Sequence, residues 1–231
     1  MRLRLFTLLT AGSLVAGAAI GTGPASASHR PSAVHRGHAA QAPRANPNLT
    51  LLYDQNNNDT GVAIVSQNFE PTYDQYDTLG ADDFRVAKGQ HWALNEVDVT
   101  GTYFNGAGPA ASETVSVYAD AAGVPGALVK AVTKVGTDNG FGSFVIPVGN
   151  IKLRPHKRYW ISVRANMDLA TGGEWGWNTR TIVGKRSNPA VWENPGGGFA
   201  LGCATFSNMQ TCLGAVGEGP DFMFTLRGTI T

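Results

Sequence analysis

The strongest constraint on the fold of this chain is a two-residue alternation of apolar and polar side chains in short segments. The apolar positions of the clearest segments are Val97, Val99 and Tyr103, Val115 and Val117, Tyr159, Ile161 and Val163, and Phe222, Phe224 and Leu226. Alternation places one set on a core and the other on the opposite face, as in an antiparallel sheet. Weaker strand patterns lie near residues 62–66, 84–86, 127–133, 143–148 and 191–193, and no window has a capped helical stripe.

Glycine and proline clusters separate these segments. They occur at Gly106–Pro109, Gly123–Gly126, Asp138–Gly140 and Asn194–Gly198. About ten short strands joined by such turns predict an all-β fold, which we interpret as a single antiparallel β-sandwich, jelly-roll-like, over residues 50–231.

The first 27 residues have the pattern of a secretory signal peptide. Arg2 and Arg4 precede an apolar stretch over residues 5–20, and Ala25-Ser26-Ala27 follows as a cleavage motif. The apolar stretch is shorter than the roughly 20 residues of a membrane span. We therefore expect a secreted protein, extracellular or periplasmic, without membrane insertion; a membrane anchor is the alternative.

Residues 28–49 differ in composition from the rest of the chain. Residues 28–48 hold three His, three Arg, three Pro and five Ala, with no acidic residue and no apolar periodicity. Such a composition buries too little apolar surface to offset the entropy of ordering, so we expect a disordered basic linker.

The charge of the remaining chain is mildly acidic. All 17 acidic residues lie from Asp54 onward, together with 13 of the 18 Lys and Arg, for a formal net charge of −4. Net charge informs about partners rather than fold, and an acidic domain disfavours nucleic acid and anionic membranes as partners. We therefore predict neither partner, and the oligomeric state stays open.

Two cysteines, Cys203 and Cys212, are nine residues apart. In an exported protein they are expected to form a disulfide with each other. A reactive thiol or a metal pair is the alternative, but no histidine accompanies them at a zinc-site spacing.

Several stretches resemble a group of uncharacterised secreted bacterial β-sandwich proteins. They are Tyr53–Asn56, Ser66–Glu70, Ala81–Phe84, Val117–Asp120 with Gly123–Gly126, Tyr159–Val163 and Gly219–Phe224. The Tyr159–Val163 stretch is also similar to a strand of accessory domains in secreted hydrolases. The resemblance implies the fold and export, and it implies no catalytic residue.

The aromatic segment around Trp175 is the strongest candidate for a ligand site. Trp175 and Trp177 would face the same side of a strand about 7 Å apart, and Trp192 follows in Gly-rich sequence. Exposed rings of this kind bind the apolar faces of sugars, with Glu174 and Asn178 as polar partners at the rim. The alternative is that these tryptophans belong to the core of the sandwich.

Oxygen-bearing side chains gather in a second candidate site. Asp54, Asn56, Asn58 and Asp59 surround a turn that ends in Gly61. Six to eight oxygens suit calcium, so we predict a structural calcium ion as the only cofactor to consider. The alternative is an Asx-rich turn whose side chains bind their own backbone.

Catalytic motifs are sparse. The chain has no G-x-S-x-G and no H-E-x-x-H motif. Glu96 and Asp98 could be a catalytic carboxylate pair of a glycosidase, but two carboxylates on the exposed face of a strand would give the same pattern. We expect a non-enzymatic module that binds a polysaccharide or cell-surface glycan. The alternatives are a structural or matrix protein without a small-molecule site and a secreted hydrolase of unrecognised type.

Overall fold

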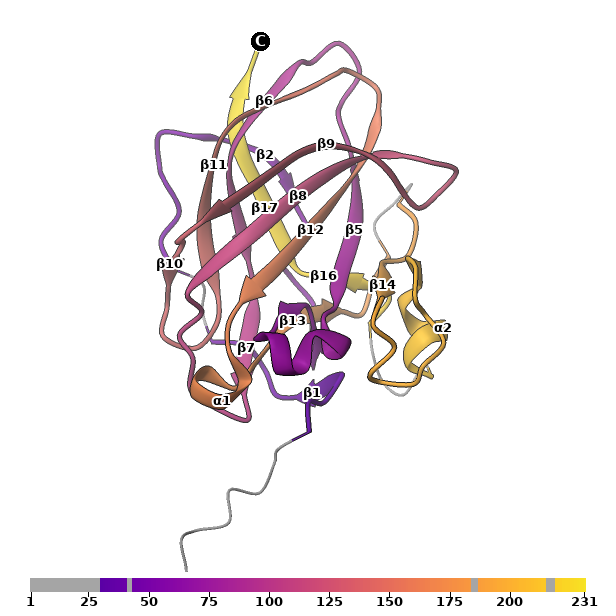
Figure 1. Cartoon of the computed structure of the whole chain (residues 1–231). Helices are drawn as coiled ribbons and strands as arrows, with labels where there is room; N and C mark the ends of the chain where they lie inside the picture. The colour runs from indigo at the N-terminus through magenta and orange to yellow at the C-terminus, as the bar shows by residue number, and fades with distance from the viewer. Residues whose placement is uncertain (1–29, 41–42, 184–186, 215–218) are drawn as a thin grey trace, which may run out of the picture. The chain divides into compact units, whose positions relative to one another are not determined.

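Three sheets with almost exclusively antiparallel pairing make up the protein (Figure 1). The computed structural model describes residues 30–40, 43–183, 187–214 and 219–231, and residues 31–231 form one compact unit. The predicted signal peptide, residues 1–27, lies outside the described residues.

The sheets are numbered I to III, and the strands of each are given in spatial order. Sheet I contains β10 (Thr137–Asp138), β11 (Phe144–Leu153), β6 (Trp92–Val99), β17 (Phe224–Ile230) and β2 (Thr50–Asp54). Sheet II contains β15 (Ser207–Asn208), β14 (Val191–Glu193), β5 (Leu79–Arg85), β12 (Arg158–Asn166), β8 (Ser112–Asp120) and β9 (Pro125–Lys134), with β4 (Gln67–Asn68) parallel to β12. Sheet III contains β1 (Val34–Arg36), β3 (Asp59–Val65), β13 (Glu174–Arg180) and β16 (Asp221–Phe222), with β7 (Gly101–Phe104) also paired to β13.

Helical structure is confined to short pieces within the described residues. These are the 3₁₀ helix η1 (Pro71–Tyr76) and the helices α1 (Leu169–Gly172) and α2 (Met209–Leu213). None of them is long and apolar enough to cross a membrane.

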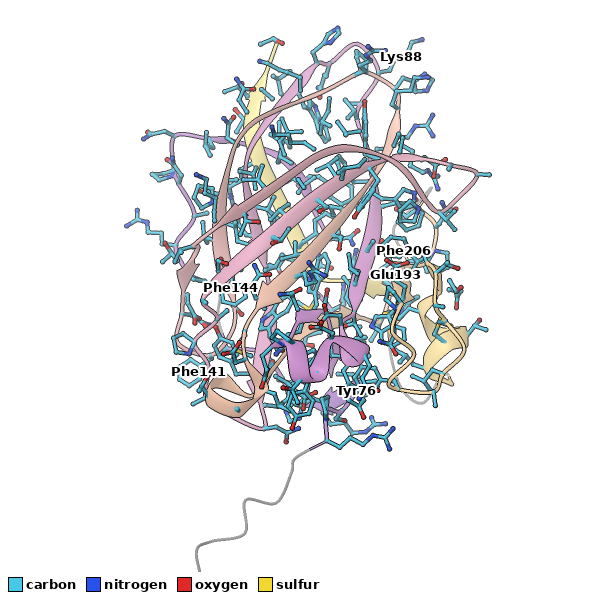
Figure 2. The ribbon with its side chains drawn as sticks, viewed as in Figure 1. Tyr76, Lys88, Phe141, Phe144, Glu193 and Phe206 are labelled. Carbon is cyan, nitrogen blue, oxygen red and sulfur yellow. A yellow bond between two sulfur atoms is a disulfide. The ribbon has the colours of Figure 1, made fainter. Side chains whose placement is uncertain are left out.

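Sheets I and II face each other across one hydrophobic core, which confirms the predicted all-β sandwich. The alternating apolar residues point inward: Val97 of β6, Val115 of β8, Ile161 of β12 and Leu226 of β17 are all fully buried. The two-residue period of each strand therefore sets which face packs on the core. Phe144 of β11, labelled in Figure 2, belongs to this core.

The opposite faces of the two sheets are less exposed than the alternation predicts. On sheet I, Asn46 donates its backbone N–H to Glu96 (3.0 Å), and Arg227 pairs with Asp98 (2.9 Å). Burial outweighs this ion pair and raises the pKa of Asp98 to about 6. On sheet II, Trp160 is fully buried in a small second cluster with Val191. Contacts between side chains of the same sheet, and the segment before β2 at Asn46, thus bury these positions.

The expectation of disorder over residues 28–49 is wrong for its described part. Strand β1 pairs with the edge of β3, in register from Val34 opposite Ile64 to Arg36 opposite Val62. The ring of His35 stacks on Phe104 with centroids 4.7 Å apart. The composition of the segment does not predict this strand, because the strand is ordered by hydrogen bonds to the edge of β3. That edge supplies the backbone partners that the segment cannot supply for itself.

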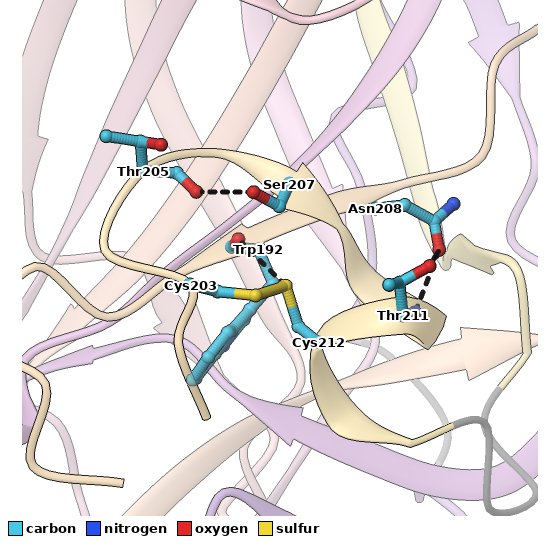
Figure 3. The surroundings of a disulfide bond; sticks show 7 residues. All are labelled: Trp192, Cys203, Thr205, Ser207, Asn208, Thr211 and Cys212. Atoms are coloured by element: carbon cyan, nitrogen blue, oxygen red, sulfur yellow. Dashed lines mark hydrogen bonds between the residues drawn. A yellow bond between two sulfur atoms is a disulfide. The ribbon is translucent and has the colours of Figure 1, made fainter. Parts of the chain in front are cut away.

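A disulfide joins Cys203 and Cys212, as predicted (Figure 3). Cys212 lies in α2, whose first turn is capped by Asn208, with its side chain accepting a bond from the Thr211 backbone N–H (2.9 Å). Cys212 is also close to the backbone oxygen of Trp192 (3.8 Å), so the bridged loop packs against β14 (Figure 3).

We predict that the disulfide stabilises this loop rather than the sandwich. A loop of about ten residues corresponds to roughly 2.7 kcal/mol of chain entropy, so in a Cys203→Ser/Cys212→Ser variant local opening of the loop should become easier by up to about that much, with little change in the free energy of global unfolding. Hydrogen exchange should accelerate within residues 196–214 and stay slow in β6 and β12. A general rise in exchange throughout the core strands would contradict this assignment.

Candidate functional site

The two indoles predicted to form a ligand platform are fully buried. Trp175 donates its Nε1–H to the Gly142 carbonyl (2.7 Å), and Trp177 donates to the Met223 carbonyl (2.8 Å). Because a ring without exposed surface cannot stack on a sugar, the platform prediction is wrong and the core alternative is correct.

The position of β13 explains this burial. The strand is central in sheet III, between β3 and β16, and its tryptophan face packs against the end of the core between sheets I and II. The Trp175 ring lies 5.4 Å from that of Phe144, and the Trp177 ring stacks 4.5 Å from that of Phe222. The alternation correctly predicts that the two tryptophans share a face, but it does not predict whether that face meets solvent or another sheet.

Trp192 is also buried, against the same prediction. Its Nε1–H donates to the Val65 carbonyl (2.9 Å), and its ring lies 6.0 Å from that of Phe199. The disulfide-bridged loop covers the strand that carries it (Figure 3). Trp192 therefore links sheets II and III rather than contacting a ligand.

Glu174 and Asn178 lie on the other face of β13, where the chain around β1 covers them. Ser32 donates its backbone N–H to Glu174 (2.7 Å), and Asn178 donates its side-chain amide to the Gly37 carbonyl (3.3 Å). Burial raises the pKa of Glu174 to about 7, although its bonds from Asn105 and Ser32 favour the charged form. Neither side chain forms the rim of an aromatic site.

The oxygens of the predicted calcium loop are engaged in bonds within the chain. Asp54 accepts from the Asn56 backbone N–H (3.0 Å) and from Thr225, whereas Asp59 accepts from the Gly61 N–H (2.9 Å) and from Asn178. The side chain of Asn58 donates to Asn57 (2.6 Å). The backbone bonds are those of Asx turns, which agrees with the alternative interpretation.

Calcium binding itself stays a prediction. The described residues include no group of three or more His, Cys, Asp or Glu side chains placed to share a metal ion. Asp54 and Asp59 also bond to different neighbours, one on β17 and the other on β13.

A large open groove lies elsewhere, at the end of the sandwich where β5 and β11 end and β12 begins. Its volume is about 830 Å³. Its basic lining side chains are Arg85, Lys152, Arg154, His156, Lys157 and Arg158. In Figure 2, Lys88, from the β5–β6 connection, marks the same end of the molecule. This groove and the second groove that adjoins it are together called the basic groove.

The turn between β11 and β12 forms one wall of the basic groove and is firmly held. His156 donates its N–H to the Val86 carbonyl (3.1 Å), and the Val86 N–H donates to the Lys157 carbonyl (3.0 Å). The Arg154 N–H donates to the hydroxyl of Tyr159 (3.0 Å). These bonds fix the backbone from which three of the basic side chains project.

Carboxylates neutralise little of this charge. Arg158 pairs with the buried Asp83 (2.6 Å), and Asp120 at the groove accepts a bond from the Trp160 indole (2.9 Å). Among the residues that the structure describes, no carboxylate forms an ion pair with Lys152, Arg154 or Lys157. Their side chains are exposed, so their charge faces solvent within the groove.

A second open groove, of about 750 Å³, adjoins the first. It is lined by His91 and Trp92 at the start of β6 and shares Lys152, Arg154 and Lys157 with the first groove. The shared residues form a cationic ridge between the two, so the basic groove extends over both sides of the β11–β12 turn.

Sequence reasoning missed this groove although a signal was present. Residues 152–158 contain four of the 13 Lys and Arg that follow Asp54. The net charge of −4 concealed this local concentration, because net charge carries no information on where charges lie.

Comparisons with known proteins add little. No protein family matches the chain, and no curated protein is similar to it in sequence. Among solved structures, it is similar to the cysteine protease and lectin-like domains of Cwp84, a surface layer associated protein of Clostridium difficile. The identity is 13%, the TM-score is 0.49, and the match covers 81% of this chain and 37% of that one. This similarity is too low to support an argument about function.

The burial of Trp175 predicts a structural effect of its removal. Trp175→Ala should lower the free energy of unfolding by about 3–5 kcal/mol in urea denaturation, because it leaves a cavity at the end of the core. Phe141→Ala, in the neighbouring loop with 64% of Phe141 exposed, is the control and should change stability by less than about 0.5 kcal/mol. Similar losses in the two variants would refute the core role of Trp175.

The raised pKa of Glu174 predicts a pH-dependent contribution to stability. Folding favours its protonated form, so this contribution is present below about pH 4.5 and is lost as pH rises through about 7. Glu174→Gln cannot titrate, and its free energy of unfolding should decline less between pH 4.5 and 7, by up to about 3 kcal/mol. Urea denaturation across this range measures the difference, with Asp168→Asn as the control for an exposed carboxylate. An unchanged decline in Glu174→Gln would contradict the assignment.

Proposed function

We propose that this protein is an exported, non-enzymatic binding module that holds an extended cell-surface polymer in the basic groove. The observation that carries the proposal is the pair of open grooves on both sides of the β11–β12 turn, joined by Lys152, Arg154 and Lys157. A polymer chain that crosses the turn contacts both grooves, whereas a small molecule occupies one of them.

The rigidity of the turn supports binding. Its backbone is held by β5 through the Val86 bonds and by Tyr159, so the groove does not need to be ordered when the ligand arrives. Pre-formed sites avoid much of the entropy cost of association. Holding a polymer requires contact area and complementary groups, and we propose no covalent step.

The predicted signal peptide and the Cys203–Cys212 disulfide support export. Disulfides persist in oxidising compartments, which include the periplasm and the cell exterior. A cell-surface polymer is a ligand that a protein in such a compartment meets.

The experiment is a binding panel followed by mapping of the contact. The purified protein is incubated with neutral and anionic cell-surface polymers, and hydrogen exchange is measured on each complex. We expect slower exchange in residues 152–158 and 85–92 and no change in residues 174–178. If no polymer slows exchange at the basic groove, the proposal fails and the structural-protein alternative gains support.

A further inference from the structure

We propose that the ligand of the basic groove is a polyanion, an extended surface glycopolymer that carries phosphate or carboxylate groups along its length. This inference rests on the proposed function and assigns the chemistry of the ligand.

The first argument is charge complementarity. Five Lys and Arg and one His line the first groove; Arg158 is paired with Asp83, and Asp120 is the carboxylate in the lining, so cations remain in excess. Charges of one sign on a concave surface reinforce one another and concentrate counter-ions there. A neutral polymer can accept hydrogen bonds from these side chains, whereas an anionic polymer also offsets the repulsion between them.

The second argument is the chemistry of the side chains. Arginine binds carboxylate and phosphate with two parallel hydrogen bonds, and lysine serves as a mobile point charge. Lys152 and Arg154 are two residues apart at the end of β11 and line both grooves, as Lys157 does. Successive anionic groups of one chain therefore find a cation on each side of the turn.

The third argument separates this ligand from other polyanions. The aromatic residues of the two grooves, Tyr159 and Trp92, are buried, at 7% and 3% exposure. Single-stranded nucleic acids are held by stacking on exposed rings, which these side chains do not offer. A membrane surface is planar, and the cations of this site line grooves. The predicted export places neither nucleic acid nor the anionic inner leaflet beside the protein.

The test compares polymers that differ in charge. Poly(glycerol phosphate) and polygalacturonate represent the phosphate and carboxylate sources, dextran is the neutral polymer, and a DNA oligonucleotide and phosphatidylglycerol vesicles are competing polyanions. Affinities are measured at 50 and 200 mM salt. We expect at least one of the two anionic glycopolymers to bind, with affinity that falls as salt rises, and dextran not to bind.

Matched variants locate the interaction. Lys157→Gln should weaken binding about tenfold, and the double variant Arg154→Gln/Lys157→Gln more, with a smaller salt dependence. Lys134→Gln removes the same charge from the far end of β9 and should change affinity less than about twofold. Thermal melting verifies that the variants are folded, and all three positions are exposed.

The outcomes distinguish the two proposals. Dextran that protects the groove from exchange with the same affinity as the anionic glycopolymers would overturn the polyanion inference and leave the binding function intact. DNA or vesicles that bind while neither glycopolymer does would overturn the inference as well. Equal losses of affinity in Lys157→Gln and Lys134→Gln would show unspecific attraction and overturn the polyanion inference. If no polymer protects the groove from exchange, both proposals are overturned.

Discussion

The burial of Trp175 and Trp177 is the constraint on which the rest of the structure depends. Two indoles on one strand face bring a large apolar surface into the core, since each large aromatic side chain buries about 200 Å². Their N–H groups find backbone carbonyls inside the core, so no polar group is left without a partner at either indole. The cost of exposing these rings fixes sheet III against the end of the sandwich, and with it the positions of β3, β7 and β1.

This closure divides the molecule into two ends with different roles. At the sheet III end, tryptophans fill the space between the sheets and β1 covers the polar face of β13, so Glu174 and Asn178 bond within the chain. Figure 1 shows the turn from β11 into β12 at the opposite end from β13. Lys152 and Arg154 at this turn are exposed. The core also reaches this end, where Trp92 and Tyr159 are buried beneath the exposed basic side chains.

The sequence predicted the architecture well because the relevant signals are local. Alternation in residues such as Val97 and Ile161 reports the core face of a strand, and glycine–proline clusters report its ends. The disulfide was predicted for a similar reason, since two cysteines nine residues apart can pair with little dependence on the rest of the fold. The candidate site was predicted poorly because its location depends on partners distant in the chain. Whether Trp175 meets water or Phe144 depends on the packing of sheets, which no window of sequence contains.

The order of the β1 segment and the concentration of cations in the basic groove share one physical lesson. Amino-acid composition predicts that residues 28–49 are disordered and that the domain is mildly acidic. Both predictions average over a segment and do not describe the surroundings of single residues. The β3 edge supplies backbone partners that β1 lacks. The end of β5 brings Arg85 beside the basic residues of the β11–β12 turn, which lie 67 to 73 positions further along the chain. The bonds from Val86 hold the backbone of this turn and thereby fix the positions from which the basic side chains project. In the proposed binding mode, the fixed turn backbone limits how far these cations move, so the spacing of a ligand's charges affects how well it fits.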